Sequence, residues 1–152
     1  MSQPYTPREL VSRLIDLFAE GRFADVPNFY AQDCELEIRF ALPTAQVVRG
    51  RDGIRAMVNA VDPSAYPKMA VSDLVIHETK DPEVIIAEWD YTGTAPDGTP
   101  FRNGNIIVVR VRDGKVVHSR DYHNHIARAA AVGRLPNLLS SLNPNPSRQT
   151  EH

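Results

Sequence analysis

Apolar residues in the first third of the chain recur at the spacing of helices. Thr6 and Glu9 form a capping-box pattern, which predicts a first helix that ends at Gly21. Residues 23–31 predict a second, shorter helix, and residues 50–61 predict a third. The apolar residues that define the first and third helices are Leu10, Leu14, Leu17, Phe18, Ile54, Met57, Val58 and Val61.

Elsewhere the pattern changes to a period of two residues, which is typical of strands. Residues 34–42 alternate apolar and charged side chains, and three longer β-rich runs follow from Met69 onward. These runs cover residues 69–78, 83–94 and 105–122. Asp97-Gly98 and Asp113-Gly114 are hairpin-turn signals, so neighbouring strands should pair antiparallel. Helices followed by a meander predict an α+β fold, a mostly antiparallel sheet with three N-terminal helices against one face.

The end of the chain predicts one short C-terminal helix and a tail. Residues 125–139 have helical character that should end near Gly133 and Pro136. Residues 137–152 are polar and interrupted by prolines, which is typical of a loose tail. No linker divides the rest, so we expect a single domain over residues 1–136.

Composition excludes several classes of function. The 152 residues carry a formal net charge of -2, so no basic field is available to hold nucleic acid. The lone Cys34 cannot form an internal disulfide. No apolar run approaches the roughly 20 residues of a membrane helix, and the first residues do not resemble a signal peptide. We therefore expect a cytoplasmic protein without a membrane partner.

The last predicted strand and the residues after it, VVHSRDYHNH (residues 116–125), concentrate groups able to do chemistry. Strand alternation places Val117, Ser119, Asp121 and His123 on one face. Asp121, His123 and His125 are spaced two residues apart, a pattern that could bind zinc or iron. His125 is expected to lie beyond the strand, however, which favours a pocket carboxylate over a metal site.

Three segments together resemble the SnoaL-like group of the nuclear transport factor two-like superfamily. They are EGRFADVPNFYAQDCELEI (residues 20–38), RGRDGIRAMV (residues 49–58) and NIIVVRVRDGKVVHSRDYHN (residues 105–124). The resemblance implies a cone, in which a curved sheet wraps around a pocket closed by helices. It also implies a homodimer formed through the sheets. Because the family includes isomerases, cyclases, hydrolases and non-catalytic modules, the fold alone does not define the activity.

The same resemblance implies a catalytic aspartate. Asp121 matches the acid/base aspartate of the family's final strand, and a carboxylate in an apolar cone has a raised pKa that suits proton transfer. Asp90 matches a second carboxylate, but Glu88 stands where limonene epoxide hydrolase has an arginine, which argues against epoxide hydrolysis. If Glu88, Asp90 and Asp121 share the cavity, repulsion should keep at least one of them protonated. The alternative is that Glu88 and Asp90 lie on a solvated sheet face.

Other residues are expected to contact the substrate. Leu14 and Ile38 align with the catalytic tyrosine and aspartate of ketosteroid isomerases, so that activity is not expected here. Met57 stands where phenazine-biosynthesis proteins carry a histidine. The full set of expected substrate contacts is Glu88, Asn105, Ser119, His123, Ile107, Val109, Leu14 and Ile38.

We therefore expect a cofactor-independent acid/base enzyme of the isomerase, cyclase, dehydratase or hydrolase type. Its substrate would be a small hydrophobic molecule, for example polyketide- or terpenoid-like. The alternative is a non-catalytic binding or assembly module with the same pocket. A homodimer should cover apolar residues on the outer side of the sheet. We expect these to be Ile85, Trp89, Ile106 and Val108.

Overall fold

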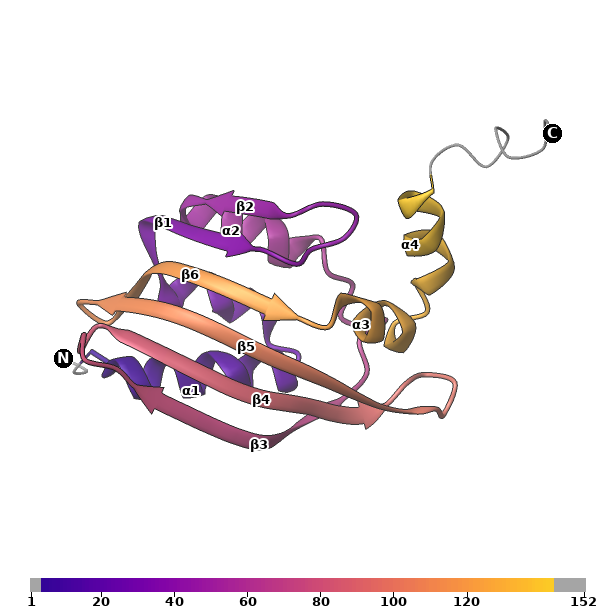
Figure 1. The fold of residues 1–152 in the computed structure, drawn as a ribbon, viewed down its shortest axis with the longest axis horizontal. Helices are drawn as coiled ribbons and strands as arrows, with labels where there is room; N and C mark the ends of the chain where they lie inside the picture. The colour runs from indigo at the N-terminus through magenta and orange to yellow at the C-terminus, as the bar shows by residue number, and fades with distance from the viewer. Residues whose placement is uncertain (1–3, 144–152) are drawn as a thin grey trace.

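The computed structural model describes residues 4–143 (Figure 1). The helices are α1 (Pro7–Ala19), the 3-10 helix η1 (Phe23–Phe29), α2 (Gly50–Asn59), α3 (His125–Ala131) and α4 (Leu135–Leu142). The strands are β1 (Tyr30–Ile38), β2 (Gln46–Arg49), β3 (Met69–Glu78), β4 (Val84–Thr94), β5 (Pro100–Arg112) and β6 (Lys115–His123). The α+β class predicted from the sequence is confirmed.

The strands form one sheet in the order β2-β1-β6-β5-β4-β3. The predicted meander is confirmed, because β3 to β6 pair antiparallel with their neighbours in sequence. The β1–β6 pair is parallel and joins the N-terminal part of the sheet to the last strand. The short strand β2, which the sequence pattern did not predict, pairs with β1 at the edge.

Helices α1 and α2 lie behind the sheet, and no helix of the described part of the chain covers its front face (Figure 1). The capping box predicted at Thr6 is present, with Thr6 Oγ1 accepting from the Glu9 amide at 3.3 Å and Glu9 Oε2 accepting from the Thr6 amide at 2.9 Å. One face of α1 is buried against the inner face of the sheet. Tyr91 on β4 donates its hydroxyl to the Ile15 carbonyl on α1 at 2.9 Å, which satisfies a buried polar group and ties the two layers together.

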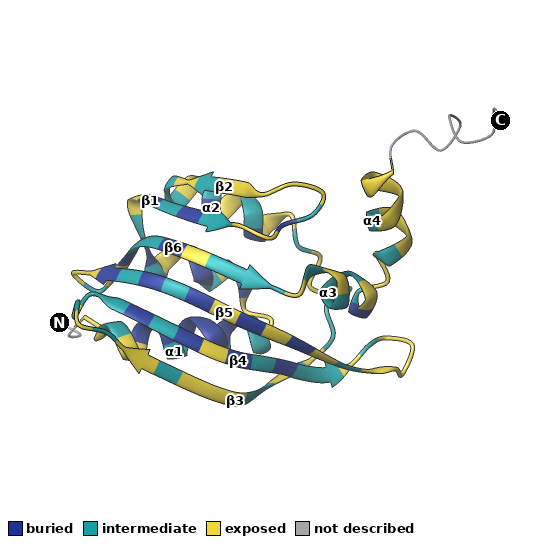
Figure 2. Ribbon diagram, viewed as in Figure 1, coloured by how far each residue is buried: buried dark blue, intermediate teal, exposed yellow. Residues whose placement is uncertain are grey.

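Buried and exposed residues alternate along β4 and β5 (Figure 2). On β4 the buried positions are Ile85, Ala87, Trp89 and Tyr91. Ile85 and Trp89 were expected on the outer side of the sheet, which is wrong for both, since they are buried. Ile106 and Val108 on β5 do lie on the outer face, and Ile106 is 42% exposed.

A break in strand register alters the predicted face of Val117. The β5–β6 pairing shifts between Arg110 and Val111, so Val116 pairs with Val111 and is fully buried. Val117 was expected beside Ser119 on the pocket side, but the irregularity turns Val116 inward instead. The positions after the break keep the expected alternation as far as His123.

Two further elements differ from their predicted form. The second helix is a 3-10 helix with Pro27 inside it, and proline cannot donate the amide hydrogen bond of a regular α-helix. The predicted C-terminal helix is two helices, because Gly133 adopts a φ of 73° between α3 and α4. Residues 137–142 of the predicted tail are therefore helical, and residues 144–152 lie outside the described residues.

No helix within residues 4–143 is long and apolar enough to cross a membrane.

His125 at the start of α3 is held in a poorly solvated place. Its Nε2 atom is buried without a hydrogen-bond partner among residues 4–143. Burial lowers the pKa of His125 from 6.5 to about 4, and the neighbouring His123 and Arg128 act in the same direction. The neutral imidazole is therefore the form that fits the fold.

We predict that protonation of His125 destabilises the protein in mild acid. Because the folded pKa of about 4 lies below the unfolded value of 6.5, the unfolded chain binds the extra proton between these values. The His125 contribution is thus complete above pH 6.5 and is lost as the pH falls towards 4, with a change of ~2–3 kcal/mol. Urea unfolding from pH 7 to pH 4 should show this loss. In His125→Gln the fall over this interval should be smaller; an identical fall in both proteins would contradict the assignment.

Candidate functional site

A cavity of about 130 Å³ lies between the inner face of the sheet and the helices. Its walls are mostly apolar, and α1, α2, β1, β4, β5, β6 and α3 all contribute to them. The residues expected from the sequence that line it are Leu14, Ile38, Asn105, Ile107, Val109, Ser119, Asp121 and His123. Eight of the expected contacts, including the aspartate of the last strand, are therefore brought together.

Asp121 is the carboxylate of this cavity. Its side chain is 16% exposed, and its strand neighbours in register are Ile38 on β1 and Ile107 on β5. Ser119 Oγ donates to Asp121 Oδ1 at 2.5 Å. His123 Nε2 lies 3.4 Å from Asp121 Oδ2. The carboxylate therefore has one hydrogen-bond donor and one imidazole beside it in an apolar surrounding.

His123 is oriented from its other ring nitrogen. Asn105 donates its Nδ2 to the Asn103 carbonyl at 2.8 Å, which leaves Asn105 Oδ1 facing His123 Nδ1 at 2.7 Å. Because an amide oxygen only accepts, the imidazole donates from Nδ1. The second nitrogen, Nε2, then faces Asp121. His123 is therefore held with this second nitrogen 3.4 Å from Asp121 Oδ2.

Two polar atoms of the cavity wall have no hydrogen-bond partner among residues 4–143. They are the Trp89 indole Nε1 and the Asn103 side-chain Oδ1, a donor and an acceptor, on residues that are 5% and 6% exposed. Unsatisfied buried groups are costly, and a ligand in the cavity is one way to satisfy them. Tyr30 also lines the wall, and burial raises the pKa of its hydroxyl well above the ordinary value, so it stays protonated.

Glu88 and Asp90 do not face the cavity, and the expectation that they share it with Asp121 is corrected. Glu88 is exposed and lies 2.6 Å from His77 Nε2 on the outer face of the sheet. Asp90 accepts from Arg102 Nε at 2.6 Å, and Arg102 also pairs with Asp73. The physical reason is that Trp89 and Tyr91 bury large apolar areas, which places the intervening acidic residues outside.

The predicted metal alternative is not supported by the positions of its three residues. Among residues 4–143, Asp121, His123 and His125 do not bring three ligand atoms within metal-binding distance of one another. The imidazole rings of His123 and His125 lie 5.8 Å apart between centroids. His125 begins α3, as expected from the sequence, so its side chain no longer follows the strand.

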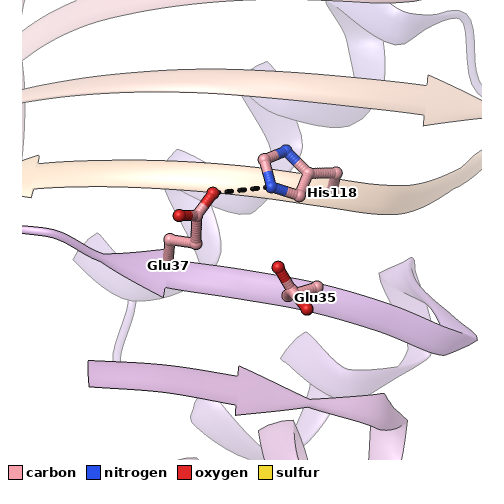
Figure 3. Close-up of side chains that lie close together, drawn as sticks. All are labelled: Glu35, Glu37 and His118. Atoms are coloured by element: carbon pink, nitrogen blue, oxygen red, sulfur yellow. Dashed lines mark hydrogen bonds and ion pairs between the residues drawn. The ribbon is translucent and has the colours of Figure 1, made fainter.

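A different cluster, Glu35, Glu37 and His118, has the spacing of a metal site (Figure 3). None of its members lines the cavity. Glu37 Oε2 lies 2.8 Å from His118 Nε2 and accepts from Arg120 Nε at 2.9 Å. Arg49 pairs with Glu35 at 3.3 Å. Since cationic side chains already neutralise both carboxylates, the cluster needs no metal ion.

Sequence reasoning missed several cavity residues. Trp89 and Tyr91 line the cavity, and their aromatic character could have indicated that their face of β4 points inward. Tyr66 and Arg128 also line it, from the segment before β3 and from α3. No pattern in the sequence predicts that Arg128 lines the cavity, because its position depends on the direction that α3 takes after β6.

Comparisons with solved structures agree with the fold described above. A Bacillus subtilis protein named as a candidate isomerase superposes with a TM-score of 0.71 at 21% identity, over 83% of this chain and 91% of that one. A Catenulispora acidiphila protein with a ketosteroid isomerase-like fold gives a TM-score of 0.64 at 20% identity, over 85% and 95%. At these identities the likeness shows the fold alone.

Sequence comparisons identify the family. The uncharacterized protein YesE of Bacillus subtilis is 32% identical over 73 residues, 45% of this chain, and this match spans about half the length of that relative. Residues 11–119, most of the chain, match the model of the SnoaL-like domain. The resemblance seen in the sequence is thereby confirmed, and the chain belongs to the SnoaL-like domain family.

Proposed function

We propose that the protein is a cofactor-independent enzyme that moves protons on a small, mostly apolar carbonyl compound. The observation that supports this most is Asp121, a carboxylate in an apolar cavity with Ser119 and His123 beside it. A positioned carboxylate of this kind can act as general base and then as general acid. Isomerisation, aldol-type cyclisation and dehydration all need these two steps.

In the proposed mechanism, Asp121 accepts a proton from carbon next to the substrate carbonyl. The electron pair of the broken C–H bond moves into an enolate, and the proton returns to another carbon or leaves with a hydroxyl. His123 lies beside the carboxylate, with Nε2 3.4 Å from Asp121 Oδ2, and Asn105 holds the imidazole ring in this orientation. The unpartnered Trp89 N–H offers a donor for negative charge on the substrate oxygen.

The volume of the cavity favours a small substrate. An engineered protein cavity of about 150 Å³ holds benzene, and the present one is close to that size at about 130 Å³. A single ring or a short branched chain therefore fits better than the polycyclic skeletons of larger polyketides.

A non-catalytic binding module remains the second candidate. Leu14 and Ile38 place apolar groups in the cavity at the positions where the steroid-isomerase resemblance calls for catalytic groups. A protein that only binds would retain the same cavity and would not depend on Asp121 for proton transfer.

We predict that Asp121→Asn strongly slows proton transfer and leaves the fold intact. The change keeps the shape of the side chain and removes its basicity, so rates should fall by roughly 10²–10⁴-fold. The measurement is deuterium exchange of α-protons in small cyclic ketones and enones, followed by NMR. Asp90→Asn, on the outer face, is the matched control and should retain the wild-type rate. Exchange that survives in Asp121→Asn, or that a chelator abolishes, would contradict the proposal.

We predict a smaller effect with a changed pH profile for Asn105→Leu. The variant leaves His123 Nδ1–H without its acceptor, so the ring loses the tautomer and orientation that serve Asp121. The exchange rate should fall roughly tenfold, within the range of positioned acid/base effects, and its pH dependence should move. Thr92→Val, on the outer face of β4, should change neither quantity. An unaltered pH profile in Asn105→Leu would show that Asn105 has no part in proton transfer by Asp121 and His123.

We also propose a homodimer through the outer face of the sheet, where Ile106 and Val75 are 42% and 49% exposed. Large apolar residues that are exposed on an open sheet face favour association. Sedimentation velocity should find a dimer for the wild type and a monomer for Ile106→Glu. Leu139→Glu on α4, where the native side chain is 53% exposed, is the control and should remain dimeric. A monomeric wild type across a wide concentration range would rule the dimer out.

A further inference from the structure

Arg128 has a different setting from most arginines of the chain. Nine arginines within residues 4–143 form ion pairs with carboxylates. Arg128 forms none within that part of the chain, although it is half-buried and lines the cavity. A partly desolvated guanidinium without a counter-ion is unfavourable unless a ligand supplies the charge.

Tyr66 holds this guanidinium in a fixed orientation. Arg128 Nε donates to the Tyr66 hydroxyl at 2.5 Å, and Arg128 Cζ lies 5.4 Å from the centre of the Tyr66 ring. Phe23 in turn packs edge-on against Tyr66 at 5.1 Å between centroids. Neither Nη atom has a hydrogen-bond partner among the described residues. The two Nη groups therefore remain available from a side chain that has already lost much of its rotational freedom.

Arg128 and Asp121 contribute opposite charges to the same cavity. Besides burial, which is the main cause of the low pKa of His125, the Arg128 guanidinium lowers that pKa and the Asp121 carboxylate raises it. Both Arg128 and Asp121 line the cavity, together with His123, whose ring lies 5.8 Å from that of His125 between centroids. Asp121 already has Ser119 as a hydrogen-bond donor and His123 as a neighbour, whereas the one side-chain partner of Arg128 among the described residues is the Tyr66 hydroxyl.

We propose that Arg128 binds the carboxylate of the substrate, so that the substrate class is a small organic acid with an apolar body. A planar carboxylate matches the guanidinium fork, whose two free nitrogens can donate in parallel. A phosphate would call for more cationic groups than this cavity offers, since among residues 4–143 Arg128 is the one arginine or lysine that lines it. The inference rests on the proposed function in one respect, namely that the reacting end of the substrate lies at Asp121. The carboxylate of the same substrate would lie at Arg128.

The test uses Trp89, which is the single tryptophan of the chain and lines the cavity. Its fluorescence should report the binding of phenylacetate and of phenylacetamide, a neutral molecule of nearly the same shape. The wild-type protein should bind the acid roughly 10- to 100-fold more tightly than the amide, as expected for hydrogen bonds to a charged group. Arg128→Gln should remove this preference and leave amide binding unchanged.

Three variants make the result specific to Arg128. Arg134→Gln removes an exposed arginine outside the cavity and should keep the full preference for the acid. Arg128→Lys keeps the charge without the fork and should give an intermediate preference. Tyr66→Phe removes the orienting hydroxyl and should also give a partial loss. Thermal unfolding of each variant establishes that it is folded.

The outcomes separate this inference from the proposed function. Equal affinity for acid and amide, a preference that persists in Arg128→Gln, or no saturable binding of either probe overturns the carboxylate assignment. Inorganic phosphate that displaces phenylacetate with equal affinity overturns it as well. Asp121→Asn should retain the preference for the acid while losing proton transfer. If the preference holds and Asp121 proves irrelevant to catalysis, the acid-binding site stands and the proposed enzyme does not.

Discussion

The candidate site depends above all on the register of β4, β5 and β6. In this register Ile107 lies opposite both Ala87 and Asp121, and Asn105 lies opposite both Trp89 and His123. The hydrogen bond between Asn105 and His123 is thus a contact between cross-strand neighbours. A shift of one residue would move all these side chains to the other face. The pairing of the backbone therefore determines which side chains face the cavity.

The apolar surroundings of Asp121 follow from the same register. On one side it pairs with Ile107, and on the other the parallel strand β1 contributes Ile38. These neighbours exclude water from the carboxylate, while Ser119 two residues earlier on the same strand supplies a hydrogen bond. The arrangement limits solvation without leaving the carboxylate unsatisfied, as a group that exchanges protons requires.

Much of this could be read from the sequence because strand alternation is a local property. The alternation placed Ser119 and Asp121 on one face of the last strand, where Asn105 and Ile107 were also expected to contact the substrate, and all four residues line the cavity. The inward face of β4 was assigned wrongly, since the resemblance directed attention to Asp90 although the aromatic residues beside it have far more apolar area to bury. The register break at Val116 also had no local signal, because it depends on how β5 and β6 pair.

The two faces of the sheet carry different charges, which explains why Glu88 and Asp90 would be unfavourable inside the cavity. Glu88 and Asp90 have His77 and Arg102 as partners on the outer face, where water also solvates them. Inside the cavity the same carboxylates would have met Asp121 with a single arginine, Arg128, to offset three negative charges.

With one carboxylate, one imidazole and one guanidinium, the observed cavity can be nearly neutral. A bound organic acid would place its own charge at Arg128, and its apolar body would extend towards the proton-transfer pair. Because no second carboxylate competes for the guanidinium, the same outward placement of Glu88 and Asp90 that corrects the sequence prediction also leaves Arg128 free for a ligand.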